Sequence, residues 1–135
     1  MGISISSINY CPVKSLSFQN IGSCEIKKNL GILNDRIFSF SRSVDLEKAI
    51  LVEKNPNERK LNNFLTLKNS PVLNRYNFNY IDDKLDLTID NKELISISTN
   101  NLKQRSLLSN KLIELEGSLI KPISLLKNKD FPFYD

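Results

Sequence analysis

The sequence predicts a mainly β protein, a small antiparallel β-barrel of short strands with one late amphipathic helix. Hydrophobic and polar residues alternate in three short runs, over residues 76–80, 85–89 and 94–98. Tight polar turns join these runs, which is typical of a meander of antiparallel strands. After residue 100 the hydrophobic period lengthens to that of a helix. A barrel suits many short strands because closure removes exposed strand edges.

The first forty residues are expected to form three extended segments. Isoleucines separated by small polar residues predict a strand over residues 3–10, and Pro12 ends it because proline cannot donate a ladder hydrogen bond. A second extended segment is expected over residues 21–28. A third, over residues 35–42, alternates phenylalanine with serine, and we expect it to pair antiparallel with the second segment.

Residues 44–63 are polar and rich in turn-forming residues, and they predict an irregular surface excursion. A short strand is expected within it, over residues 49–52. Another short strand is expected over residues 64–67. Pro71 is expected to begin a helical turn, because proline is well accepted at the first helical position.

The helix is predicted from leucines at intervals of four, three and four residues: Leu108, Leu112, Leu115 and Leu119. Asn100 or Asn101 is the expected N-cap and Gly117 the expected end. The charged residues of the other face are expected to be solvated: Lys103, Arg105, Lys111, Glu114 and Glu116. A last short strand is expected over residues 123–126.

Composition favours one domain in 135 residues, which is enough chain to bury a core. No apolar run has the length of a membrane-spanning helix, and the N-terminus has no secretory pattern, so we expect a cytoplasmic protein without membrane contact. The net charge of +4 arises from 19 basic and 15 acidic residues. This mild excess suits an anionic small ligand as well as it suits a nucleic acid.

The chain contains no histidine and two cysteines, Cys11 and Cys24. Catalytic sites of the Ser-His-Asp and Cys-His classes are therefore excluded within this chain. A zinc site would lack ligands. We expect both cysteines to be free thiols that pack as small residues.

Three residues near the N-terminus could bind an oxyanion: Lys14, Ser15 and Arg36. Lysine offers a point charge, serine a short donor and arginine a planar fork, a set that suits phosphate. The turn around Lys14 could add backbone N–H donors. On residue types alone, the alternative that these are solvated loop side chains stays open.

Two motifs carry a family resemblance. Pro12-Val13-Lys14-Ser15 follows a hydrophobic strand, and about twenty residues later Gly31-Ile32 and Asp35-Arg36 precede an aromatic strand. This pattern resembles the N-terminal β-barrel domain of MOSC proteins, which precedes the MOSC domain that holds the molybdenum cofactor. Weaker matches extend the resemblance over most of the chain, at Phe64-Leu65-Thr66 and Pro71-Val72-Leu73.

The resemblance implies a function and a division of the chain. Members such as the amidoxime-reducing component reduce N-hydroxylated compounds, and the matching residues Lys14, Ser15 and Arg36 would contact the pterin cofactor, molybdopterin. Residues 1–127 would be the barrel domain and residues 128–135 a tail leading toward a MOSC domain. The family's metal ligand is a cysteine of the MOSC domain that neither cysteine here matches. The chain is therefore expected to be inactive alone, with a C-terminal MOSC domain or a separate subunit as its partner.

The sequence departs from the family pattern at three places. Cys11 stands where the family has tyrosine, Ile37 separates Arg36 from the aromatic residue, and the segment over residues 44–63 is longer than usual. None of these departures removes a residue that the resemblance assigns to the cofactor.

A different class of function is a stand-alone barrel that binds single-stranded nucleic acid or a protein partner. Tyr76, Phe78 and Tyr80 share one strand face and could stack on bases. The same spacing is also typical of the core face of a strand.

Overall fold

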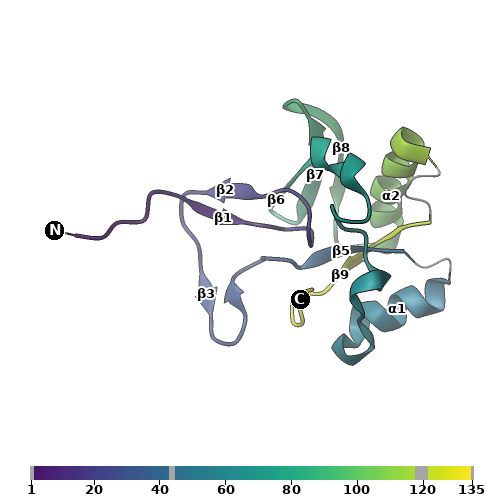
Figure 1. Ribbon diagram of the computed structural model, residues 1–135, viewed down its shortest axis with the longest axis horizontal. Coiled ribbons are helices and arrows are strands. Elements are labelled where there is room, and N and C mark those ends of the chain that lie inside the picture. Colours follow the sequence, from purple (N-terminus) through teal and green to yellow (C-terminus); the bar gives the residue numbers. More distant parts are fainter. Residues whose placement is uncertain (1, 43–44, 118–121, 135) are drawn as a thin grey trace.

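A computed structural model describes residues 2–42, 45–117 and 122–134 (Figure 1). The strands are short: β1 (Ile8–Tyr10), β2 (Gln19–Ile21), β3 (Ile26–Lys27), β4 (Gly31–Ile32), β5 (Phe38–Ser41), β6 (Asn77–Ile81), β7 (Lys84–Ile89), β8 (Lys92–Ser98) and β9 (Ser124–Lys127). The α-helices are α1 (Leu46–Lys54) and α2 (Leu102–Glu116). Three 3₁₀ turns complete the elements: η1 (Pro56–Glu58), η2 (Leu61–Asn63) and η3 (Pro71–Arg75).

The strands form four small antiparallel sheets, with the orders β1-β2, β3-β4, β5-β9 and β6-β7-β8. This confirms the mainly β class, and among the described residues no sheet closes on itself. The expected neighbour of the third strand was wrong. β5 pairs with β9, placing Phe38 opposite Lys127, and an isolated parallel bridge joins it to Val13. Contacts with residues far away in the sequence therefore hold β5 at the centre of the fold.

The predicted meander is confirmed as β6-β7-β8. Its two turns have left-handed backbone at Asp82-Asp83 and Asp90-Asn91, with φ between 49° and 64°. Two consecutive residues of positive φ are what a tight hairpin requires, and Asn and Asp accept this conformation better than other side chains. The register places Leu85 opposite Tyr80 and Ile97, which directs all three side chains into the core.

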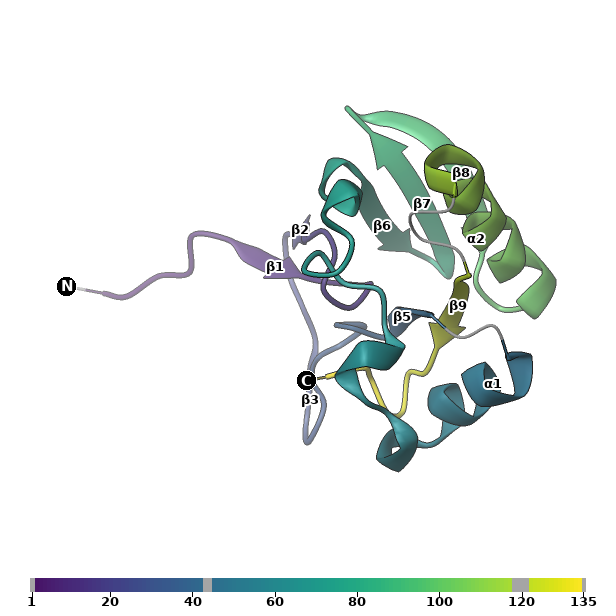
Figure 2. The ribbon, with the colours of Figure 1, turned by 45° about the vertical axis from the view of Figure 1, so that its right-hand side comes forward.

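The main core lies between the meander, the β5-β9 sheet and α2, as Figure 2 shows. Leu108 and Leu112 of α2 are fully buried in it, whereas Leu115 is 37% exposed and Leu119 lies outside the described residues. The Asn101 side chain accepts a hydrogen bond from the Gln104 N–H at 2.7 Å, so the predicted N-cap is confirmed. Gly117 ends the helix with a φ of 62°, also as predicted.

Residues 49–52 form part of helix α1 instead of the expected strand. Asp45 caps the helix by accepting a hydrogen bond from the Glu47 N–H at 2.9 Å. Ala49 and Val52, one helical turn apart, are buried in a second core cluster with Phe64, Leu126 and Phe133. Only these two residues of the helix are buried, and two positions are too few to show a helical period in the sequence.

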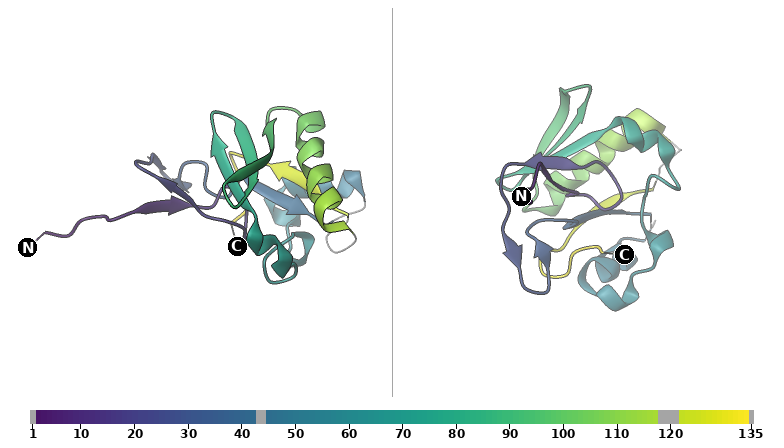
Figure 3. Two further views of the ribbon diagram at one scale, coloured as in Figure 1. Left: turned by 90° about the horizontal axis from the view of Figure 1, so that it is seen from above. Right: turned by 60° about the vertical axis from the view of Figure 1, so that its left-hand side comes forward.

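The N-terminal segments are shorter than predicted. The first strand is limited to β1, and residues 2–7 form an extended arm that leaves the body of the protein (Figure 3). The second segment divides into β2 and β3. The strand expected over residues 64–67 is reduced to one bridge between Phe64 and Ser41. Within the described ranges, no helix is long and apolar enough to cross a bilayer.

Candidate anion-binding site

Lys14 is buried although it carries a charge. The loop after β1 is bound to β5 by a hydrogen bond of 2.8 Å from the Lys14 N–H to the Phe38 carbonyl. The Lys14 side chain is therefore directed inward, where the residue is only 3% exposed. Its ammonium group donates to the Phe133 carbonyl at 3.3 Å and lies 5.8 Å from the centre of the Phe64 ring. These contacts compensate part of the desolvation of the charge.

Arg36 contacts the same C-terminal residue, Phe133, as Lys14 does. Its backbone has a φ of 54°, and it is fixed from both sides: its N–H donates to the Cys11 carbonyl at 2.6 Å, and its carbonyl accepts from the Phe133 N–H at 2.8 Å. The side chain is 40% exposed, and its guanidinium lies 3.6 Å from the Asp35 carboxylate and 5.7 Å from the centre of the Tyr134 ring. Arg36 therefore presents an accessible fork of donors.

The structure thus brings two of the three predicted residues to the same short segment. Phe133 bonds to Lys14 through its carbonyl and to Arg36 through its N–H. Tyr134 lies against the Arg36 guanidinium and lines a cavity of about 210 Å³ together with Lys14. The aromatic residues of this segment indicate burial, but no motif in it predicts that residues 133–134 join the site.

Ser15 belongs to a neighbouring depression. It lines a wider cavity of about 740 Å³ with Arg42, Thr66 and Lys68, and its φ is 60°, a left-handed value that serine rarely adopts. Leu61 borders both cavities, so the two depressions meet at that side chain. Lys14 and Ser15 therefore line adjoining cavities, and Arg36 lines neither of them.

The two cavities form what we call the basic face. Its cations come from four separate segments: Lys14, Arg42, Arg59, Lys60 and Lys68. Among the described residues no Asp or Glu lines either cavity. A surface with several cations and no lining carboxylate favours an anionic ligand.

Arg59 was missed by sequence reasoning and acts as a clamp. Its guanidinium donates to four backbone carbonyls at 2.8–3.0 Å, those of Val52, Glu53, Phe131 and Pro132. It also lies 4.0 Å from the centre of the Phe133 ring, and burial lowers its pKa. Arg59 therefore holds the C-terminal segment against α1. A lone arginine in a turn-rich stretch gives no signal for such a role.

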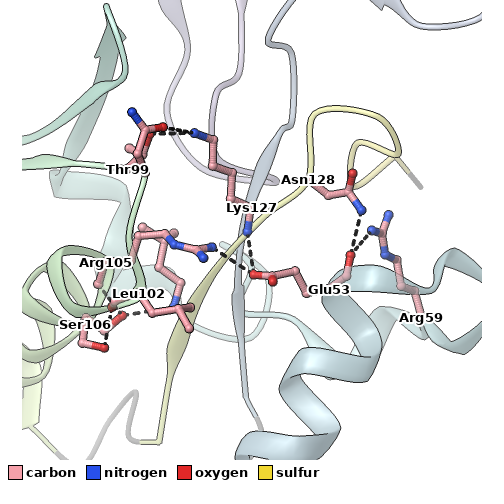
Figure 4. Close-up of polar contacts among 11 residues, drawn as sticks. Glu53, Arg59, Thr99, Leu102, Arg105, Ser106, Lys127 and Asn128 are labelled. Atoms are coloured by element: carbon pink, nitrogen blue, oxygen red, sulfur yellow. Dashed lines mark hydrogen bonds and ion pairs between the residues drawn. The ribbon is translucent and has the colours of Figure 1, made fainter.

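Glu53 joins three elements, α1, α2 and β9 (Figure 4). Its carboxylate accepts from Arg105 of α2 at 2.9 Å and from the Lys127 N–H of β9 at 3.1 Å. Both side chains of the Glu53–Arg105 ion pair are almost buried, at 13% and 11% exposed. The expectation that Arg105 is solvated was wrong. It was also wrong for Glu116, which is 4% exposed and bound to Arg75 and Tyr76.

The aromatic stripe is part of the core. Tyr76, Phe78 and Tyr80 are 2%, 0% and 5% exposed, so their interpretation as a core face is confirmed. Phe78 and Tyr80 pack edge-on or tilted against phenylalanines of β5. Side chains this deeply buried cannot stack on bases.

The cysteines are both free thiols, as predicted. Cys11 is buried, its thiol donates to the Val13 carbonyl at 2.8 Å, and burial raises its pKa. Cys24 is half-buried. Over the described residues, no group of three or more His, Cys, Asp or Glu side chains could hold a metal ion.

Comparison with known proteins finds no family model that matches the sequence and no curated protein or solved structure that matches the chain. The MOSC resemblance of the two N-terminal motifs therefore stays a prediction from those motifs.

Proposed function

We propose that this chain forms the phosphate and pterin side of a molybdenum-cofactor site in a MOSC-type protein that reduces N-hydroxylated compounds. The observation that carries the proposal is the arrangement of Lys14 and Arg36, which both bond to Phe133, next to the cavity of the basic face that Lys14 and Tyr134 line. These are two of the residues that the family resemblance relates to the cofactor.

The donors present fit the anionic end of such a cofactor. Arg36 offers a side chain that is 40% exposed and lies 3.6 Å from the Asp35 carboxylate, and a guanidinium binds phosphate through paired N–H donors. Lys60 is exposed at the rim of the cavity that Lys14 lines, and Lys68 serves the adjoining depression beside Ser15. In this assignment the buried Lys14 supplies mainly its charge, because its ammonium already binds the Phe133 carbonyl.

Backbone strain adds support. Ser15 and Arg36 both have left-handed φ values, 60° and 54°, which cost about 1–2 kcal/mol for an L-residue other than glycine. Such conformations persist where the surroundings enforce them, and they are enriched at binding sites. Two of the three predicted site residues have this property.

The residues present do not fit the metal end. Cys11 is buried and bonded to a backbone carbonyl, and the described residues provide no ligand cluster. When bound, the cofactor supplies the redox chemistry at a metal held by another domain. The proposed role of this chain is to bind and orient the cofactor, with a C-terminal MOSC domain or a separate subunit completing the site.

The test uses this chain joined to, or co-purified with, a MOSC domain. The double variant Lys14→Met/Arg36→Ala should lower molybdopterin content at least tenfold, because it removes both charges while methionine keeps most of the buried lysine volume. The matched control is Lys84→Ala/Lys103→Ala, which removes two exposed cations away from the basic face. Full cofactor content in the Lys14/Arg36 variant would overturn the proposal.

A stand-alone binder of single-stranded nucleic acid is the second candidate, favoured by the same basic face and no longer by the aromatic stripe. It predicts binding of an oligonucleotide that weakens steeply with salt, because phosphate contacts release counterions. Lys60→Ala/Lys68→Ala should then abolish binding in the chain alone. An absence of binding at low salt would remove this candidate and leave the first unaffected.

A further inference from the structure

The N-terminal arm, residues 2–7, has little contact with the body: the Ser7 hydroxyl accepts a hydrogen bond from the Asn9 side chain at 3.3 Å, and Ile5, Ser6 and Ser7 border a depression beside β2. Ile3 and Ile5 are 104% and 80% exposed, and no backbone hydrogen bond joins the arm to any described residue. The arm is extended and projects away from the body, as the left view of Figure 3 shows. Six residues of unpaired extended backbone are a template for adding a strand.

The unpaired edge continues into β1. This strand pairs only with β2, and its second edge becomes covered at Cys11, whose carbonyl accepts from the Arg36 N–H at 2.6 Å. The free edge therefore extends over residues 2–9. A strand of this length is typical of those in stable sheets, whereas a two-stranded hairpin alone is marginal.

The arm lacks the features by which proteins protect an exposed edge. Residues 1–13 contain no charged side chain, and the first proline is Pro12. Edges are usually protected by lysine, proline or an inward-pointing charge. Here isoleucine alternates with serine instead, a pattern that favours pairing with another strand.

We propose that the arm pairs antiparallel with the arm of a second copy of this chain. Antiparallel pairing of two identical segments is self-complementary about a two-fold axis. A single contact therefore pairs the free strand edge of each copy with that of the other. The arms carry no charge, so their contact meets no like-charge repulsion, although each whole chain carries +4. Because the arms project outward, pairing keeps the two bodies apart (Figure 1).

The contact is small. A stable interface buries about 1,200 Å² or more in total, and two short paired strands supply less than that. The dimer is therefore weak, and its population depends on concentration. This inference does not depend on the proposed cofactor role, because the arm lies outside both cavities of the basic face.

The test is the mass of the 135-residue chain by sedimentation up to about 1 mM, which detects a dimer with a Kd in that range. The mass should rise from 15.5 kDa toward twice that value with concentration. Ile3→Lys/Ile5→Lys should stay monomeric throughout, since it adds four like charges at the arm contact of a dimer. The control Leu51→Lys/Leu107→Lys adds the same charge at exposed helix positions and should still dimerise.

Amide hydrogen exchange gives a second readout. The N–H groups of residues 4–7 should gain protection as the concentration rises, and only in the wild type and the control. A wild-type chain that stays at 15.5 kDa up to about 1 mM would overturn the inference. So would dimerisation of the Ile3/Ile5 variant, because it would place the interface elsewhere.

Discussion

The Lys14 ammonium donates a hydrogen bond to the carbonyl of Phe133, 119 residues later in the chain. This bond joins the loop after β1 to the C-terminal segment. The N–H of Phe133 in turn donates a hydrogen bond to the carbonyl of Arg36. Two of the three predicted site residues, Lys14 and Arg36, are therefore positioned by the C-terminal segment. Their geometry and the packing of Phe133 should respond to mutation together.

Phe133→Ala should lower the free energy of unfolding by about 3–5 kcal/mol, because the ring is 1% exposed and its loss leaves a cavity in the second core cluster. Urea denaturation measures the change. Phe131→Ala is the control: that ring is 56% exposed, and its removal should change the free energy by less than about 0.5 kcal/mol. Equal effects of the two variants would contradict the packing described here.

Glu53→Gln should lower the free energy of unfolding by about 1.5–3 kcal/mol, the range for a hydrogen bond to a charged group. The change leaves the Arg105 guanidinium nearly buried without its counter-charge. Glu114→Gln is the matched control, because Glu114 is 70% exposed in its pair with Lys111. Exposed pairs contribute about 0–1 kcal/mol, so a control effect as large as that of Glu53→Gln would refute the role of the network.

The free energy of unfolding should fall as the pH rises from about 10 to about 12. Burial raises the pKa of Tyr10 to about 12, whereas the unfolded side chain titrates near 10. In this window the unfolded state loses the proton and the folded state keeps it, so alkali favours unfolding. Two pKa units correspond to about 2–3 kcal/mol.

Tyr10→Phe isolates this contribution. It removes the hydroxyl that donates toward Gln19 and the Tyr80 carbonyl. The decrease in the free energy of unfolding that Tyr10 causes at alkaline pH should disappear with it. Chemical denaturation at pH values between 9 and 12 should give a shallower decline for the variant. Parallel declines for the two proteins would show that Tyr10 titrates normally in the folded state.

Ser15 should tolerate glycine better than a β-branched residue. At a φ of 60°, Ser15→Val should lower the free energy of unfolding by about 1–3 kcal/mol, whereas Ser15→Gly removes the steric conflict and should not lower it by more than about 0.5 kcal/mol. Thermal and urea unfolding measure both. If glycine proves as harmful as valine, the left-handed backbone is not the constraint at this position.

Local features of the fold could be predicted from the sequence. The meander follows from alternating residues and from its polar turns: the first was expected at Asp82-Asp83, where it lies, and the second at Asn91-Lys92, one residue after the left-handed pair Asp90-Asn91. The late helix follows from its leucine period, with Asn101 and Gly117 as its ends. Each of these signals lies within one short window of sequence.

Features that depend on distant contacts could not be predicted. Helix α1 buries only Ala49 and Val52, and the cluster that covers them includes Phe133 from the end of the chain. The pairing of β5 with β9 also joins segments far apart in sequence, whereas the second segment was the nearer candidate. Residue type alone did not distinguish the buried Arg105 from its solvated neighbours, because its partner Glu53 lies on another helix.

The candidate site was predicted in part. Lys14 and Arg36 do approach one segment, but Ser15 lines the adjoining cavity, and Arg59 and Tyr134 became visible only in three dimensions. Short motifs identify residue types that suit a phosphate group, while the tail that positions them carries no such motif.

The central claim is that the basic face, together with Arg36, which contacts Tyr134 at one of its cavities, binds the phosphate end of a pterin cofactor. The most direct measurement is a titration of the chain with a phosphorylated pterin at low salt, followed by amide chemical shifts in NMR spectra. We expect weak saturable shifts at Lys14, Ser15, Arg36 and Lys60, which Arg36→Ala/Lys60→Ala removes and Lys84→Ala/Lys103→Ala leaves unchanged. Absence of shifts at these amides, or identical shifts in the Arg36/Lys60 variant, would contradict the account.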